Sequence, residues 1–287
     1  MEVIMIRILD CSAVRVGLLV ATLVGLGASD AHAQRAPDMA TLDRGDGITK
    51  LGVDLGFTFL NFPPYESALR LEIYGQVVTK SGLGFYGALP LASSFGAADD
   101  AEDPLDLLPD NATAFGNLEV GGLYVTNVSP RFALVFRGGL ALPTATSGRD
   151  AAATLAYATF PRMTDLALAS DAWYVRLGIS PLLYVDRLFF RADLGFDIGM
   201  DDNANELLRL NVGVGYDFGP VAAGLELANL GTLDDFGDDE DFIHTLAFTL
   251  RFMGEQFQPF LSVGAPLDDS RRDAVEVFIA GGIQIVP

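Results

Sequence analysis

The stretch of sequence that decides the fold is Leu188-Phe-Phe-Arg-Ala-Asp-Leu-Gly-Phe-Asp-Ile-Gly199. Every even-numbered residue from 188 to 198 is apolar, whereas the odd-numbered residues include Arg191, Asp193 and Asp197. Successive side chains of a β-strand point to opposite faces of the sheet. The stretch therefore predicts a strand with one apolar face and one polar face.

The same alternation recurs along most of the chain. Most of the predicted strands are longer than the ~5–6 residues typical of soluble sheets. They match the ~9–11 residues with which a tilted strand crosses a bilayer. We predict twelve strands, near residues 51–60, 69–79, 82–89, 115–126, 131–141, 172–182, 187–199, 206–218, 221–230, 243–253, 257–265 and 274–286.

Short connections, such as 80–82 and 219–220, alternate with long ones, such as 90–114 and 142–171. Outer-membrane barrels combine short periplasmic turns with long outer loops. Since lipid offers the backbone no hydrogen-bond partners, only a helix or a closed sheet can span it. We predict an all-β fold, a transmembrane antiparallel up-and-down barrel of about twelve strands over residues 51–287. The alternative is a soluble all-β domain whose apolar faces meet in a core.

The N-terminus has the features of a secretory signal peptide. Arg7 and Arg15 precede an apolar run over residues 16–27, and Ala31-His32-Ala33 follows. A charged start, a short apolar core and small residues at a cleavage site are typical of such signals. We predict cleavage near Ala33, a periplasmic N-terminal segment over residues 34–50, and a barrel in the outer membrane of a Gram-negative cell with both termini periplasmic.

Composition excludes several classes of function. The chain of 287 residues has 18 Lys and Arg against 38 Asp and Glu, and its net charge of -20 disfavours nucleic-acid binding. The single cysteine excludes a disulfide framework and a CxxC-type zinc site. The sequence has no GxSxG, HExxH or P-loop motif. We therefore expect no enzymatic activity, no cofactor and no metal ligated by cysteine or histidine.

The segment Phe115-Gly-Asn-Leu-Glu-Val-Gly-Gly-Leu-Tyr-Val-Thr126, followed by Phe132-Ala-Leu-Val-Phe-Arg-Gly-Gly-Leu-Ala-Leu-Pro-Thr144, resembles a known family. It is similar to the G-x-G-D-L and L-P-T-G stretch of transporter-like barrels in the MetA-pathway-of-phenol-degradation family. Asn117 stands where that family has Asp, and Ala145 stands where it has Gly. The resemblance implies an outer-membrane channel for small organic compounds.

The polar faces of the predicted strands carry many charges. A lysine or arginine that faces lipid at the bilayer midplane costs ~2–4 kcal/mol, so we expect these side chains to face the lumen. Two interpretations remain open: an arginine-lined wall that favours anionic groups, or an internal salt-bridge network that stabilises the barrel. The predicted lumen-lining residues are Arg70, Glu72, Glu119, Arg137, Arg176, Arg191, Asp193, Arg209, Glu226, Arg251 and Glu276.

Three loops have distinct compositions. The 90–114 and 231–242 loops are rich in Asp and Glu and could hold divalent cations, although solvated negative loops are the simpler interpretation. The 142–171 loop contains an Ala-rich stretch over residues 150–160, which predicts a short helix begun by Asp150. This loop either folds inward and constricts the pore or lies over its mouth.

We expect a channel that passes or binds small solutes passively and contacts outer-membrane lipid. One alternative is a closed structural barrel whose acidic outer loops serve surface interactions. Another is a lipid hydrolase, because phospholipase A barrels also have twelve strands and carry a Ser-His-Asn site on the outer wall. Alternation along the predicted strand places His244 on the lipid-facing side, as such a site requires. However, Thr245 and Leu246 follow it instead of the His-x-Ser pattern of those enzymes.

Overall fold

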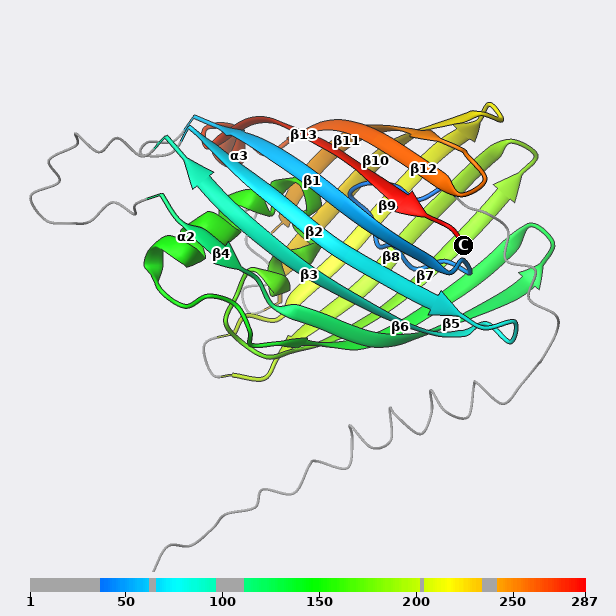
Figure 1. Cartoon of the computed structure of the whole chain (residues 1–287), viewed down its shortest axis with the longest axis horizontal. Helices are drawn as coiled ribbons and strands as arrows, with labels where there is room; N and C mark the ends of the chain where they lie inside the picture. Colours follow the sequence, from blue (N-terminus) through cyan, green and yellow to red (C-terminus); the bar gives the residue numbers. More distant parts are fainter. Residues whose placement is uncertain (1–36, 62–65, 97–110, 202–203, 234–241) are drawn as a thin grey trace, which may run out of the picture.

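The computed structural model describes residues 37–61, 66–96, 111–201, 204–233 and 242–287, which form one antiparallel β-barrel (Figure 1). The strands confirm the alternation predicted from the sequence. Their bounds are β1 (Lys50–Leu60), β2 (Ser67–Val78), β3 (Leu83–Phe95), β4 (Thr113–Phe115), β5 (Leu118–Ser129), β6 (Phe132–Leu142), β7 (Tyr174–Val185), β8 (Leu188–Gly199), β9 (Leu207–Asp217), β10 (Val221–Thr232), β11 (Phe242–Phe252), β12 (Phe257–Pro266) and β13 (Val275–Ile285).

The sheet closes on itself. β1 pairs with β2 on one side and with β13 on the other, where Val53 lies opposite Ile283. The short β4 and the longer β5 both pair with β3, so together they occupy one place around the barrel. The wall is therefore a closed barrel of twelve strands, as the sequence predicted.

The apolar faces point outward. On β8, Leu188, Phe190 and Leu194 are exposed, whereas Arg191 and Asp193 are buried inside the barrel. In a soluble protein large apolar side chains are buried, whereas here they are exposed around the whole wall. Leu51, Phe248 and Leu261 on other strands are further examples. The soluble alternative, in which these faces pack against one another in a core, is excluded by this arrangement.

Two segments fill the lumen. The first is the loop between β6 and β7, which contains α2 (Arg149–Ala158) and the 3-10 helix η1 (Phe160–Leu168). Leu155 of α2 and Leu168 of η1 pack with Ala68 and Ala92 of the wall in one buried apolar cluster. The predicted helix therefore exists, and of the two placements left open by the sequence the structure has the inward one.

The second segment is residues 37–49, here called the plug segment, which runs inside the barrel before it enters β1 (Figure 1). Met39 and Leu42 are buried, and so are Asp38, Asp43 and Asp46. The sequence predicted that residues 34–50 form a periplasmic segment. The structure instead places the described part of that segment in the lumen, because its acidic side chains find cationic partners there.

Glu276 corrects one prediction about the lumen. Between Phe59 and Leu60 the register of β1 against β13 shifts, so that Val277 and Val275 face consecutive residues of β1. Val275 is buried by this irregularity and Glu276 is exposed. A bulge changes which face each following side chain takes, and strict alternation does not reveal it.

The predicted signal peptide over residues 1–33 lies outside the described residues, and so do all the acidic residues of the 90–114 and 231–242 loops. Within the described residues, no helix is long and apolar enough to cross a membrane. No group of three or more His, Cys, Asp or Glu residues there could hold a metal ion.

Candidate functional site: the filled lumen

The inward faces of the strands bring ten of the eleven predicted lumen residues into the barrel. Arg137 keeps a small exposed fraction of its side chain, at 12%, and the other nine are buried. Alternation along each strand explains this placement, because every second side chain points into the lumen. The ten residues are Arg70, Glu72, Glu119, Arg137, Arg176, Arg191, Asp193, Arg209, Glu226 and Arg251.

Ion pairs join most of the lumen charges into one connected network. It links six arginines with six carboxylates, so its formal charge is balanced. A buried charge without a partner is costly, and this balance is what a low-dielectric interior demands. Its members are Arg44, Arg70, Arg137, Arg162, Arg176 and Arg209 with Asp43, Asp54, Glu72, Glu119, Asp165 and Asp197.

Arg176 on β7 connects the wall to the inward loop. Its guanidinium lies 2.9 Å from Glu119 Oε2 of β5 and 3.1 Å from Asp197 Oδ1 of β8. It also reaches Asp165 of η1, at 3.4 Å, and donates to the backbone oxygen of Thr164 at 2.8 Å. Each of these groups is buried, so this arginine holds three carboxylates of three different elements.

The plug segment binds the wall through two consecutive residues of opposite charge. Asp43 accepts from Arg209 Nη1 of β9 at 2.9 Å and lies 3.1 Å from Arg137 Nη1 of β6. Arg44 pairs with Asp54 of β1 and Glu72 of β2. Burial raises the pKa of Asp43, but Arg209 and Arg137 outweigh burial and hold that pKa well below its usual range.

Glu226 of β10 holds the segment by its backbone. The Ala40 N–H and the Thr41 N–H donate to the two oxygens of its carboxylate at 3.1 and 2.7 Å, and the Thr41 hydroxyl donates to it at 2.6 Å. Arg251 adds a further anchor, because its Nε donates to the Asp38 backbone oxygen at 2.9 Å. The described plug segment has no strand pairing with the wall, and these polar contacts take its place.

The chain enters β1 beside a second group of charges. The Lys50 ammonium pairs with Asp38 and lies 2.9 Å from Asp46 Oδ2. Gln76 Nε2 donates to Asp46 Oδ1 at 2.6 Å. Burial raises the pKa of Asp46 to about 6, although Lys50 opposes this shift. Asp46 is the one acidic residue of the segment described here that titrates within the range of physiological pH.

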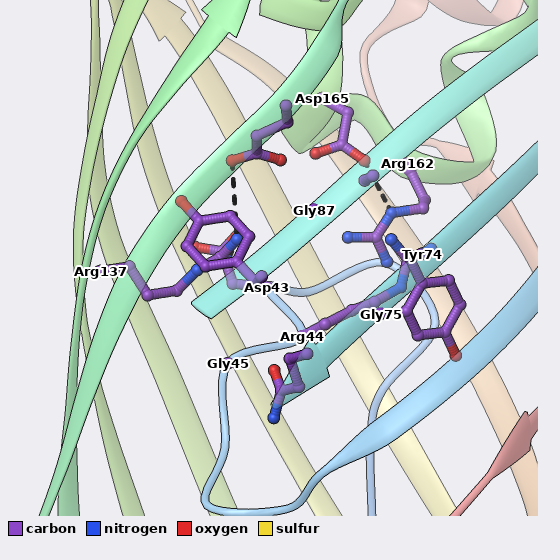
Figure 2. Close-up of a pocket in the computed structure, with 13 residues that line it drawn as sticks. Asp43, Arg44, Gly45, Tyr74, Gly75, Gly87, Arg137, Arg162 and Asp165 are labelled. Carbon is purple, nitrogen blue, oxygen red and sulfur yellow. Dashed lines mark hydrogen bonds and ion pairs between the residues drawn. The ribbon is translucent and has the colours of Figure 1, made fainter. Parts of the chain in front are cut away.

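A small pocket, with room for about one water molecule, remains between the plug segment and the wall (Figure 2). Two charged residues of the segment line it, Asp43 on the side of Arg137 and Arg44 on the side of Tyr74. Arg44 lies 3.8 Å above the centre of the Tyr74 ring, and Arg137 lies 4.4 Å above that of Tyr86. The pocket therefore offers charges of both signs and two aromatic faces.

The hydrolase alternative rests on His244. Its Nδ1 lies 2.6 Å from Asn229 Oδ1 on the neighbouring strand, which is the pairing of an imidazole with an amide that such a site requires. However, nucleophilic catalysis also needs a hydroxyl or thiol close to the base. The residue two positions further on, on the same face of β11, is Leu246, which carries no nucleophile.

The sequence analysis missed the residues that the two inserted segments contribute. Asp43 and Arg44 belong to a stretch without strand periodicity, and Arg162 and Asp165 belong to a loop. One signal was compositional: four charges lie within the described plug segment at residues 38, 43, 44 and 46. The many charges predicted on the inner faces of the strands were a second signal, because buried charges need partners.

Solved structures share this fold. An outer membrane channel from Pseudomonas putida F1 matches with 13% identity and a TM-score of 0.55, over 88% of this chain and 100% of that one. A NanC porin matches with 9% identity and a TM-score of 0.53, over 83% of this chain and 100% of that one. At these identities the likeness shows the fold alone, which is that of outer-membrane porin-like barrels.

No family model matches the chain. No curated protein matches it either. The resemblance to the MetA-pathway-of-phenol-degradation family therefore stays a prediction from the sequence. What the comparisons support is the broader class of outer-membrane barrels.

Proposed function

We propose that this protein is an outer-membrane channel for small solutes and that the structure is its closed state. After export and cleavage of the signal peptide near Ala33, the barrel spans the outer membrane with both chain ends on the periplasmic side. Its exposed Leu, Val and Phe side chains contact lipid. The plug segment then blocks the lumen, and solutes pass when it withdraws.

The observation that carries this proposal is the filling of the lumen by two inserted segments. In barrels of about eight strands the wall's own side chains fill the interior, whereas sixteen or more leave an aqueous channel. Here the wall has twelve strands, and both the plug segment and the β6–β7 loop lie inside it. A lumen that needs added chain to fill it becomes a passage when part of that chain leaves.

The two inserted segments are held differently. The loop is anchored by a large apolar cluster that includes Leu155, Phe160 and Leu168, in addition to the ion pairs of Asp165. The plug segment buries few apolar side chains, chiefly Met39 and Leu42, and is otherwise held by ion pairs and hydrogen bonds, which water can replace. Every strand of the barrel pairs with neighbouring strands rather than with this segment. The plug segment can therefore leave without opening the sheet, and we assign the gate to it.

The decisive experiment locks the plug segment to the wall. Met39 lies against Gly213 of β9, so close that a Cβ at position 213 would collide with its sulfur. The only cysteine of the chain is Cys11, within the predicted signal peptide, so a Met39→Cys/Gly213→Cys pair can be oxidised selectively. We expect the mature protein to conduct in planar bilayers, the oxidised variant to be silent, and reduction to restore its current.

The same double variant kept reduced serves as the control, because it carries the same change in packing without the bond. Equal currents before and after oxidation would overturn the assignment of the gate. A wild-type protein that inserts, runs as a folded barrel on unheated gels and stays silent would favour the alternative function. That alternative is a closed structural barrel, which the balanced ion-pair network also fits.

A further inference from the structure

We infer that Asp43 and Arg44 occupy a solute-binding site of the lumen, and that its solute is a small zwitterion with one carboxylate and one basic group. The inference rests on the proposed channel function, because it names the solute of that channel. In the closed state the plug segment supplies both charges itself. In the open state the solute takes their place on the same wall residues.

One half of the site recognises an anion. The guanidinium groups of Arg209 and Arg137 converge on the Asp43 carboxylate at 2.9 and 3.1 Å. Arg137 is kept in place by the Tyr86 ring below it and by Glu119 at 3.7 Å. Guanidinium groups bind carboxylates through strong charge-assisted hydrogen bonds. A free carboxylate therefore fits where the Asp43 carboxylate now lies.

The other half recognises a cation. Arg44 lies between the carboxylates of Asp54 and Glu72 and stacks on the Tyr74 ring. Two carboxylates and an aromatic face are the groups that bind an ammonium or guanidinium ion. These residues come from β1 and β2, whereas Arg137 and Arg209 come from β6 and β9. The two halves therefore lie on different parts of the wall, and the Asp43–Arg44 pair bridges them.

The wall's charges explain why the solute carries both signs. When the plug segment withdraws, Arg137 and Arg209 lose Asp43 and keep one carboxylate each, Glu119 and Asp197. Asp54 loses Arg44, its ion-pair partner, and Glu72 keeps only Arg70. A solute with a single charge restores the lost contacts of one half and none of those of the other half. In a confined site, uncompensated charges are unfavourable. A zwitterion restores both halves, as the resident pair does.

A small pocket marks where the segment is packed least tightly against this site. It is lined by Asp43 and Arg44 and by residues of both halves, namely Arg137, Tyr74 and Tyr86. Because it has room for only about one water molecule, a solute reaches the groups of the wall as the segment moves away. Exchange of the resident pair for the solute is then a competition between two ligands of the same chemistry.

The test compares three capped dipeptides of similar size, acetyl-Asp-Arg-amide, acetyl-Asp-Gln-amide and acetyl-Asn-Arg-amide. Their binding to the refolded mature chain is measured by titration calorimetry. In the variant Asp43→Asn/Arg44→Gln, the segment no longer competes by charge. We expect this variant to bind the doubly charged peptide about tenfold or more tighter than either singly charged one, because only that peptide pairs with both halves.

Single variants keep the test decisive if the double variant folds poorly. Asp43→Asn vacates only the anion half and should prefer the acidic peptide, whereas Arg44→Gln should prefer the basic one. An Arg131→Ala variant, changed at an exposed arginine outside the lumen, should bind as the wild type does. Equal binding of all three peptides to the double variant, or no switch between the single variants, would overturn the site.

Bilayer currents from the same preparations separate this inference from the proposed function. A barrel that conducts but binds none of the peptides keeps the channel and overturns the zwitterion site. A barrel that binds the peptides as expected but never conducts keeps the site and overturns the channel.

Discussion

Thr41 and Glu226 lie 185 positions apart in the sequence, yet the backbone N–H and the hydroxyl of Thr41 both donate to one oxygen of the Glu226 carboxylate, at 2.7 and 2.6 Å. Both residues are buried in the lumen. This contact fixes the position of the plug segment along β10. It also explains why a carboxylate on the inner wall has no arginine partner: backbone and hydroxyl donors of the segment satisfy it.

Glu226→Ala should loosen the plug segment. The substitution removes the acceptor for the donors of Ala40 and Thr41, and each buried donor left unsatisfied costs about 1–3 kcal/mol. We expect a larger open fraction in single-channel recordings. Glu226→Gln keeps one acceptor oxygen and should lie between the wild type and the alanine variant. An alanine variant as closed as the wild type would show that this contact does not hold the gate.

Closure should tighten as the pH falls from 7 to 5. Burial raises the pKa of Asp46 to about 6 in the docked segment, above its ordinary value of 3.8. The docked state therefore binds the proton more tightly than the displaced state, and docking gains about 1 kcal/mol over this range. The neighbouring charges are Lys50 and Asp38. The measurement is the open fraction against pH.

The control for this pH dependence is Asp46→Asn, which should respond less to pH over the same range. Asp43 contributes in the opposite direction at lower pH. Its pKa lies below the ordinary value, so its ion pairs with Arg137 and Arg209 persist above pH 4 and weaken only in stronger acid. An open fraction that rises from pH 7 to pH 5 in the wild type would contradict the assigned role of Asp46.

Arg176→Met should destabilise the barrel itself. The arginine pairs with Asp165, Glu119 and Asp197, and its loss leaves three buried carboxylates short of a cation. Breaking a buried ion pair by removing one partner costs about 3–5 kcal/mol. The temperature at which the folded band disappears on gels should fall. Arg131→Met is the matched control, because 67% of its side chain is exposed and its ion pair is 4.0 Å long.

The wall was predictable from the sequence because alternation is a local property of each strand. The faces of β8 and β9 can be assigned from period two alone, and ten lumen residues followed from it. Glu276 was assigned wrongly because the irregularity between Phe59 and Leu60 depends on how β1 meets β13. The sequence predicted one strand over residues 115–126, and the interruption between β4 and β5 at Asn117 was missed. It depends on the inward loop, because the Asn117 side chain donates to the Ala167 and Ala172 backbone oxygens.

The contents of the lumen were not predictable in the same way. Residues 37–49 have no periodicity, and their position depends on partners more than a hundred residues away, such as Arg209 and Glu226. The two interpretations of the lumen arginines could not be separated without those partners. In the structure each of Arg137, Arg176 and Arg191 is paired with a carboxylate, so these arginines form internal salt bridges.

Leu155→Ala should loosen the inward loop while leaving the plug segment docked. Leu155 is buried between α2 and the wall, and truncation of such a residue costs about 2–5 kcal/mol. We expect faster cleavage of the β6–β7 loop by an added protease. The open fraction should change little, because Glu226, Arg209 and Arg251 of the wall hold the segment in addition to Arg162 of the loop. A variant that opens the channel as widely as Glu226→Ala would assign the gate to the loop instead.

Gly213→Val should open the channel without removing any charge. A side chain at this position of β9 meets the Met39 sulfur and the Leu42 side chain, so both side chains must shift for the plug segment to dock. A branched residue also suits a strand, so the barrel should keep its stability on unheated gels. Gly138→Ala is the control, because a Cβ there makes only an ordinary contact with Leu177. An increased open fraction in Gly213→Val but not in Gly138→Ala would place the barrier to solutes at the plug segment. An unchanged open fraction would show that the segment can shift within the lumen and still block it.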